Sequence, residues 1–254
     1  GVSNGIGAYV SGAGAQSIFS QAYEKVIHDS GDLNSVTITD GSANSDKSND
    51  AQLFVDWLTT AENDVGLLVM GDQVAYDLSL SEAAVATEFV TTICGVSLVD
   101  NSYYDITGGR DAGGVVTPLI TGVTGGPFQG LTYYAYGGCF IINDFDVLEK
   151  NGPGEYALQY PDFGGDSYYA GIYTRQLTGN GSNLKTIWVG HSFMLIRDTG
   201  TGTAPARNTF LKMVYEEFLN EANTEVTGDD SPAAYHLAQN FPNPFNPSTR
   251  IQFA

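Results

Sequence analysis

Apolar residues recur along this chain at two periods, one typical of amphipathic helices and the other of strands. Spacings of three and four residues predict helices over 17–31, 46–60, from about 79 to 93, and 207–221. Continuous or alternating apolar runs predict strands over 35–39, 65–70, 131–136, 155–160, 168–174 and 185–190. The run 65–70 contains no polar position, which is typical of a strand buried on both faces.

The order of these elements predicts an α/β fold. Helices alternate with strands in the first hundred residues, and this alternation favours a mostly parallel sheet with helices on both faces. The middle of the chain, over 96–173, is dominated by glycine, tyrosine and β-branched residues. We expect this part to form a Gly/Tyr-rich β insertion, built of antiparallel strands or long loops and appended to the sheet.

Changes in composition divide the chain into four parts. Residues 1–15 predict an N-terminal loop or a truncated upstream region, 16–222 the α/β domain, and 223–236 a polar, acidic linker. Residues 237–254 form a separate proline-rich segment. With 254 residues and 42% hydrophobic content, the chain is expected to bury one sizeable core and to carry an appendage.

The charge balance narrows the range of partners. Asp and Glu number 29 against 10 Lys and Arg, which gives a formal net charge of −19. Such a field repels phosphate backbones and anionic headgroups, so neither nucleic acid nor a membrane surface is an expected partner. No apolar run is long enough to predict a membrane span.

No metal or cofactor is predicted, although calcium stays open as an alternative. Calcium prefers oxygen ligands, and the chain has an acidic stretch that lacks the spacing of an EF-hand loop. This stretch contains Asp40, Asn44, Asp46, Asn49 and Asp50. The three histidines lack the spacing of zinc ligands.

The proline-rich segment contains the most specific motif. It runs from Leu237 to Phe253 and resembles the start of the type A C-terminal sorting domain of type IX secretion substrates. Nearly every signature position is matched, and the central ones are Gln239, Asn240, Phe241, Pro242, Asn243, Pro244, Phe245, Asn246 and Pro247. The prolines fix φ and remove backbone donors, so extended or turned backbone is expected there.

This resemblance implies a location and a partner. Type IX substrates pass through the periplasm and across the outer membrane, so we expect an extracellular or outer-membrane surface protein and the type IX machinery as its partner. In that family the sorting domain continues as a small β-sandwich. Residues 237–254 would then be the start of that sandwich, and the chain is expected to stop early.

A second resemblance concerns the α/β domain. A helix over 48–60, the strand 65–70 with its turn, a late strand ending at His191 and a closing helix are similar to the class I glutamine amidotransferase-like fold, which is flavodoxin-like. In active members a cysteine nucleophile occupies a tight strand-to-helix turn, where backbone N–H groups stabilise the thiolate. Asp72 stands at that position, and no glutamate follows two residues after His191. We therefore expect a degenerate elbow at Gly71, Asp72 and Gln73, without amidotransferase chemistry.

The two cysteines leave further chemistry open. Cys139 follows a strand-like run and could act with His191 as the nucleophile and base of a secreted cysteine hydrolase or peptidase. The residues after Cys139 do not predict the helix start that would lower a thiol pKa. Cys94 and Cys139 could instead form a disulfide, or both could remain buried thiols. No catalytic residue is favoured, and a non-catalytic interaction or structural protein is the preferred hypothesis.

Tyrosines gather in three clusters. Tyr offers an apolar ring and a hydroxyl, which suits contact with a glycan or a protein, whereas alternating tyrosines also fill one face of strands. Self-assembly through exposed strand edges is a further possibility. The clusters contain Tyr103 and Tyr104; Tyr133, Tyr134 and Tyr136; and Tyr168, Tyr169 and Tyr173.

Overall fold

The computed structural model describes residues 23–38, 50–108, 117–136, 144–199 and 205–219. Contacts divide the chain into a first unit that ends at Leu219 and a second unit that begins at Asn220. The acidic stretch 40–49, Cys139, the predicted linker and the sorting motif lie outside the described residues. Predictions about those segments stay predictions.

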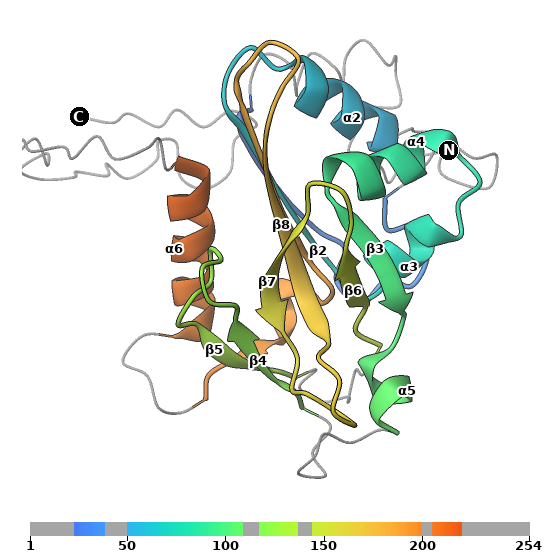
Figure 1. The fold of residues 1–254 in the computed structure, drawn as a ribbon, viewed down its shortest axis with the longest axis vertical. Coiled ribbons are helices and arrows are strands. Elements are labelled where there is room, and N and C mark those ends of the chain that lie inside the picture. Colours follow the sequence, from blue (N-terminus) through green and yellow to red (C-terminus); the bar gives the residue numbers. More distant parts are fainter. Residues whose placement is uncertain (1–22, 39–49, 109–116, 137–143, 200–204, 220–254) are drawn as a thin grey trace, which may run out of the picture. The chain divides into compact units, whose positions relative to one another are not determined.

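Ten strands and several short helices make up the described part of the first unit (Figure 1). The strands are β1 (Lys25–Asp29), β2 (Val65–Met70), β3 (Val96–Asp100), β4 (Leu119–Gly122), β5 (Thr132–Ala135), β6 (Val147–Lys150), β7 (Glu155–Gln159), β8 (Tyr169–Leu177), β9 (Asn183–Val189) and β10 (Ile196–Arg197). The helices are α2 (Asp50–Thr60), α3 (Val74–Ser79), α4 (Ala84–Thr87), η1 (Glu88–Ile93), α5 (Tyr103–Thr107), η2 (Phe193–Leu195) and α6 (Ala206–Leu219).

All ten strands join one mixed sheet, which curls into a half-barrel. The main path runs β1-β2-β9-β8-β7-β4-β5-β10, while β3 pairs with β6 and β6 also pairs with β8. Only β1–β2 and β2–β9 are parallel among the described pairings. The prediction of a mostly parallel sheet with helices on both faces is therefore wrong.

The middle of the chain explains this difference. Parallel neighbours need a crossover of a dozen or more residues, whereas the turns between β7, β8 and β9 are shorter and force antiparallel pairing. The Gly/Tyr-rich segment is consequently an integral part of the sheet, because β8 lies directly against β9.

The buried strand β2 organises the core. Every residue of β2 is buried, which confirms the prediction made for 65–70. Val65, Leu67 and Val69 pack in one cluster with α2, η1 and β9, while Leu68 and Met70 pack in a second cluster with α6. A methyl group on Gly66 would lie 2.6 Å from the ring of Phe218, so this glycine lets α6 approach the strand closely.

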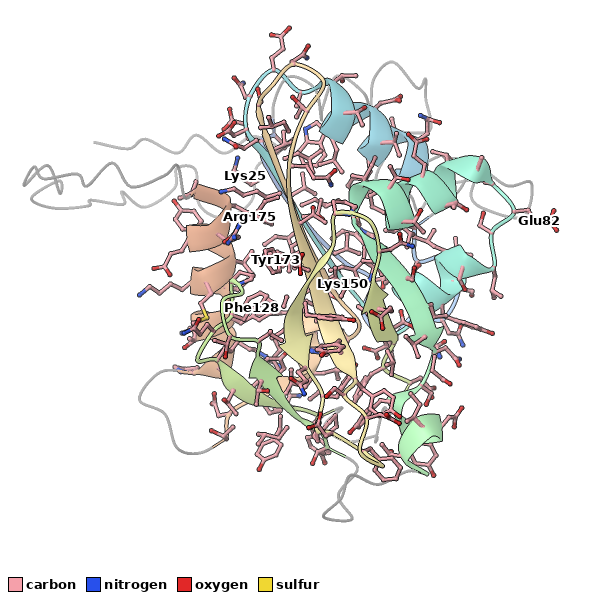
Figure 2. All side chains as sticks on the ribbon, in the orientation of Figure 1. Lys25, Glu82, Phe128, Lys150, Tyr173 and Arg175 are labelled. Carbon is pink, nitrogen blue, oxygen red and sulfur yellow. The ribbon has the colours of Figure 1, made fainter. Side chains whose placement is uncertain are left out.

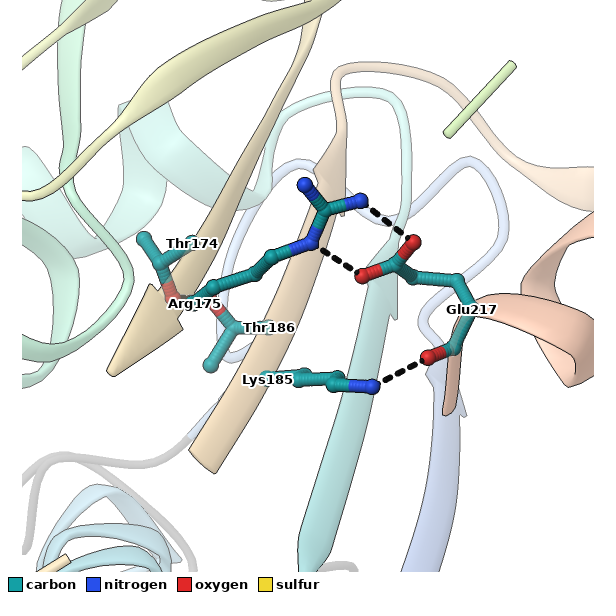
Figure 3. Close-up of polar contacts among 5 residues, drawn as sticks. All are labelled: Thr174, Arg175, Lys185, Thr186 and Glu217. Atoms are coloured by element: carbon teal, nitrogen blue, oxygen red, sulfur yellow. Dashed lines mark hydrogen bonds and ion pairs between the residues drawn. The ribbon is translucent and has the colours of Figure 1, made fainter. Parts of the chain in front are cut away.

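An ion pair fastens α6 to the β8–β9 hairpin (Figure 3). The carboxylate of Glu217 accepts hydrogen bonds from Nε and Nη2 of Arg175, both at 2.7 Å. Lys185 Nζ also donates to the Glu217 carbonyl at 2.7 Å. Arg175 lies over the ring of Tyr173 as well, with 5.0 Å to the ring centroid, and both residues are labelled in Figure 2.

Two of the predicted helices need correction. Residues 25–29 form strand β1 rather than the end of a helix over 17–31, because pairing with β2 outweighs the helical spacing. The closing helix is present as α6. The spacing of its apolar residues predicts a buried face of Leu211, Val214, Tyr215 and Phe218, but Leu211 and Tyr215 are exposed and Phe210 is buried with Val214 and Phe218.

Candidate functional site

The turn after β2 is a tight strand-to-helix connection. β2 ends at Met70 and α3 begins at Val74, so only Gly71, Asp72 and Gln73 separate the two elements. Gly71 has φ +152°, and a Cβ there would lie 2.0 Å from Ser30 Oγ. Glycine is therefore required at the first position of this turn.

Asp72 points into the protein from this turn. Its side chain is only 2% exposed, and Oδ1 accepts a hydrogen bond from the Ser192 N–H at 2.8 Å. Oδ2 has no hydrogen-bond partner in the part of the chain that the structure describes. Burial raises the pKa of Asp72 to about 7, with neighbouring carboxylates adding to the rise and the Ser192 N–H opposing it.

Asp146 lies beside Asp72 and immediately precedes β6. Its backbone N–H donates to the carbonyls of Asp72 at 3.1 Å and Gly190 at 2.9 Å. Oδ2 accepts from the N–H groups of Ala75 at 2.7 Å and Tyr76 at 3.4 Å, at the start of α3. Oδ1 has no hydrogen-bond partner within the described segments, and burial, with a contribution from Asp72, raises the pKa of Asp146 well above its usual range.

His191 follows β9 and is completely buried. Its Nδ1 lies 3.1 Å from the Ser192 carbonyl and its Nε2 lies 2.8 Å from the Tyr133 hydroxyl. A carbonyl only accepts, so Nδ1 carries the proton and Nε2 accepts from Tyr133. Burial lowers the pKa of His191 to about 4, which keeps the ring neutral at pH 7.

Asp29 is the last residue of β1 and contacts the segment that follows His191. Its Oδ2 accepts from Ser192 Oγ and from the Phe193 N–H, both at 3.2 Å. Asp29, Asp72 and His191 thus follow the carboxyl ends of three parallel strands, β1, β2 and β9, where open α/β sheets place their ligands. We call Asp29, Asp72, Asp146 and His191 the carboxylate cluster.

Sequence reasoning found part of this cluster. Asp72 and His191 were expected at the ends of strands, and the structure joins their segments through the Asp72–Ser192 hydrogen bond. Asp146 was missed, because the strand that follows it, β6, has only four residues and no clear apolar alternation. Asp29 was missed because the helical spacing concealed β1.

The cysteine chemistry stays a prediction. Cys94 is fully buried, and burial raises the pKa of its thiol above the usual range. Cys139 lies outside the described residues, so neither its disulfide with Cys94 nor its action with His191 can be placed. Both ring nitrogens of His191 already have protein partners, which weighs against that histidine as a base.

The tyrosine clusters divide between core and surface. Tyr133 is fully buried, and Tyr103 stacks on Tyr160 with 4.4 Å between ring centroids. Tyr134 and Tyr136 are exposed on β5 and its end.

One exposed face combines tyrosine with a cation. Arg197 of β10 lies opposite Tyr134 in the strand register, and Arg197 Nη1 donates to the Met194 carbonyl at 2.6 Å. The Met194 side chain is itself exposed. We call Tyr134, Tyr136, Met194 and Arg197 the tyrosine face.

Two searches of the described residues gave negative results. In the part of the chain that the structure describes, no group of three or more His, Cys, Asp or Glu side chains could hold a metal ion. No helix in the same described segments is both long enough and apolar enough to cross a lipid bilayer.

Comparisons with known proteins give only distant similarity. No family model matches the chain, and no curated protein matches it. Among solved structures, the mmIFT52 N-terminal domain is similar with a TM-score of 0.43 and 12% identity, over 81% of this chain and 78% of that one. The GH42 β-galactosidase Gan42B from G. stearothermophilus, in its E323A form, gives a TM-score of 0.40 and 11% identity, over 77% of this chain and 22% of that one.

Proposed function

We propose that this protein is a type IX secretion substrate that acts outside the cell, or at its surface, as a non-catalytic interaction module. The observation that carries the proposal is the motif from Gln239 to Pro247, which matches the sorting-domain signature at successive positions. An alternating segment from Arg250 to Phe253 follows it, as the first strand of a sorting domain would.

The carboxylate cluster supports the non-catalytic part of the proposal. The resemblance of the sequence to class I glutamine amidotransferases implies that Asp72 stands where active members carry a thiol, and the Asp72 side chain is buried and bonded to Ser192. His191 is buried as well, and its two nitrogens bond to Tyr133 and to a backbone carbonyl. These contacts connect β2, β9 and β5, so they stabilise the fold where an enzyme would bind a substrate.

The tyrosine face is the surface that we assign to a partner, which we take to be a cell-surface glycan. Exposed tyrosine rings stack on sugar faces, while their hydroxyls and the Arg197 guanidinium donate hydrogen bonds. Tyr134 and Arg197 lie directly opposite each other across two strands, so one partner can contact both.

Export is tested by changing the motif in the full-length protein within a bacterium that has type IX secretion. The double substitution Pro244→Ala and Phe245→Ala is expected to leave the protein in the periplasm. Ser248→Ala is the matched control, because the signature leaves that position free, and it is expected to be exported normally. Quantitative detection in periplasm, surface and medium decides the matter, and normal export of the double variant would refute the proposal.

Partner binding is tested with the purified secreted protein and cells that lack it. Tyr134→Ala with Tyr136→Ala is expected to abolish binding, while Tyr215→Ala, an exposed tyrosine on α6, is expected to leave it unchanged. Periodate treatment of the cells, which cleaves sugar diols, should abolish binding by the unchanged protein. Binding that survives periodate but disappears after protease treatment would replace the glycan with a protein partner.

A further inference from the structure

Two aspartates of the carboxylate cluster are buried and joined to each other through the backbone. Asp72 and Asp146 are 2% and 0% exposed, and a backbone hydrogen bond of 3.1 Å joins the two residues directly. Each has one oxygen that accepts from backbone N–H groups and one oxygen, Asp72 Oδ2 or Asp146 Oδ1, that has no hydrogen-bond partner among the described residues. An ionised carboxylate in such a place is costly, because burial removes its hydration and no cationic partner replaces it within the described segments. Buried charges in proteins are for this reason usually paired.

The surrounding charges make double ionisation still less favourable. No Lys or Arg forms an ion pair with either residue within the described segments. The charged groups that act on the pair are Asp29, Asp32, Asp77 and Asp144, and the Tyr160 hydroxyl also interacts with both aspartates. All four charged members of this set are carboxylates, so each raises the free energy of a second negative charge.

We propose that Asp72 and Asp146 together retain a proton at neutral pH, and that its loss at alkaline pH releases the segment from Ser192 to Leu195. Two adjacent carboxyls in a water-poor site titrate as a pair, and the second proton is lost only with difficulty. When both are ionised, repulsion and the gain in hydration favour rotation of one side chain toward water. Asp72 is the one that is less completely buried, and its rotation breaks the hydrogen bond to the Ser192 N–H.

The released segment links the carboxylate cluster to the surface. Ser192 begins η2, and the Leu195 carbonyl accepts a hydrogen bond of 2.8 Å from the N–H of Tyr136. The proton that the pair retains therefore fixes the backbone that supports one edge of the tyrosine face. The inference concerns the fold and stands whether or not export or glycan binding is confirmed.

The test is an NMR titration of the protein labelled with ¹³C at aspartate Cγ, because the Cγ shift reports the protonation of each carboxyl. The signals assigned to Asp72 and Asp146 should show at least one protonated carboxyl at pH 6 and a joint change above neutral pH. Asp72→Asn should remove one signal and simplify the other to a single titration. If both groups are already ionised at pH 5, the proposal is wrong, and this result needs no variant.

Amide exchange tests the release itself. After correction for base catalysis, protection of the Ser192 amide should fall about tenfold or more between pH 6 and pH 8.5, because local opening exposes it. Protection in Asp72→Asn should not depend on pH, since an asparagine oxygen still accepts from Ser192. Asp105→Asn, the same change at an exposed site on α5, should behave like the unchanged protein. Recovery of protection at pH 8.5 on addition of calcium chloride would overturn the proton site in favour of a cation site.

Discussion

Two buried carboxylate sites in this protein neutralise charge in different ways. Glu217 of α6 is 7% exposed and faces a guanidinium, which approaches it with two hydrogen bonds of 2.7 Å. Asp72 and Asp146 are at least as deeply buried, yet their hydrogen-bond donors are backbone N–H groups alone. The first site is compensated by an ion pair, whereas the second depends on protons.

This difference determines how each site responds to pH. The Glu217 carboxylate raises the pKa of Arg175, so the guanidinium stays charged at any ordinary pH. At the carboxylate cluster the pKa of Asp72 is raised from 3.8 to about 7. Substitutions at the first site should therefore change stability at all pH values, and those at the second should change its pH dependence.

The largest effect is expected for Asp72→Asn, measured as stability against pH. The folded protein keeps the Asp72 proton up to about pH 7, while the unfolded chain loses it near 3.8, so stability falls as pH rises between these values. Asparagine mimics the neutral acid and removes this fall. The variant should gain about 2–4 kcal/mol relative to the unchanged protein between pH 4 and pH 8, measured by urea unfolding.

His191 makes the stability change with pH in the opposite direction to Asp72, which provides an internal check. Its pKa is about 4 in the folded protein and 6.5 when unperturbed, so stability is lost as pH falls from 6.5 to 4. In Asp72→Asn the rise from His191 opposes the fall that Asp146 still contributes, so the stability of this variant should depend on pH much less steeply across this range than that of the unchanged protein. A variant whose curve runs parallel to that of the unchanged protein would show that Asp72 is ionised in both states.

Arg175→Met should have the second largest effect. The substitution leaves the Glu217 carboxylate buried without its main partner, and hydrogen bonds to charged groups contribute about 1.5–3 kcal/mol. Because Arg175 is half-exposed and Lys185 remains nearby, we expect a loss of about 2 kcal/mol at pH 7. The loss should be nearly constant from pH 5 to pH 9, and a strong pH dependence would contradict the contrast between the two sites.

The sequence predicted some strands and turns of the fold but not how the strands pair. The sequence predicted β2, the turn at Gly71 and Asp72, and β9. Unbroken apolar runs are typical of buried strands, and a glycine after such a run is typical of a tight turn. The direction of strand pairing was not predictable from these local patterns. It depends on which segments meet, and β8 could only be placed beside β9 once their hairpin was known.

The pairing partners of charges are equally non-local. Arg175 and Glu217 are 42 positions apart, and Asp146 reaches the N–H of Ala75 across 71 positions. Asp146 stands in a short polar stretch before a four-residue strand, so nothing nearby in the sequence distinguishes it from a solvated aspartate. The pKa of Asp146 is raised mainly by burial, and this burial exists only once the sheet is assembled.

Tyr133→Phe should lower the stability by less than Arg175→Met. It tests the contribution of His191 independently of Asp72 and Asp146. The hydroxyl is the only described partner of His191 Nε2, so its removal leaves a buried acceptor unpaired and should cost about 1 kcal/mol at pH 7. Since the packing of the ring is retained, no cavity is created. Unfolding midpoints in urea would give the value, and Tyr134→Phe, an exposed neighbour, should be neutral.

The smallest effect is expected for Lys212→Ala, which removes an exposed ion pair on the same helix as Glu217. Lys212 Nζ lies 3.5 Å from Glu216 Oε1, and the two side chains are 72% and 54% exposed. Water screens such pairs, so the loss should be about 0.3–0.5 kcal/mol and should disappear in molar salt. Arg175→Met should keep most of its effect under the same salt, because one partner of its pair is buried. If Lys212→Ala and Arg175→Met lose the same stability, the burial of Glu217 adds nothing to its ion pair. The contrast between a buried carboxylate stabilised by an ion pair and one stabilised by a proton would then be wrong.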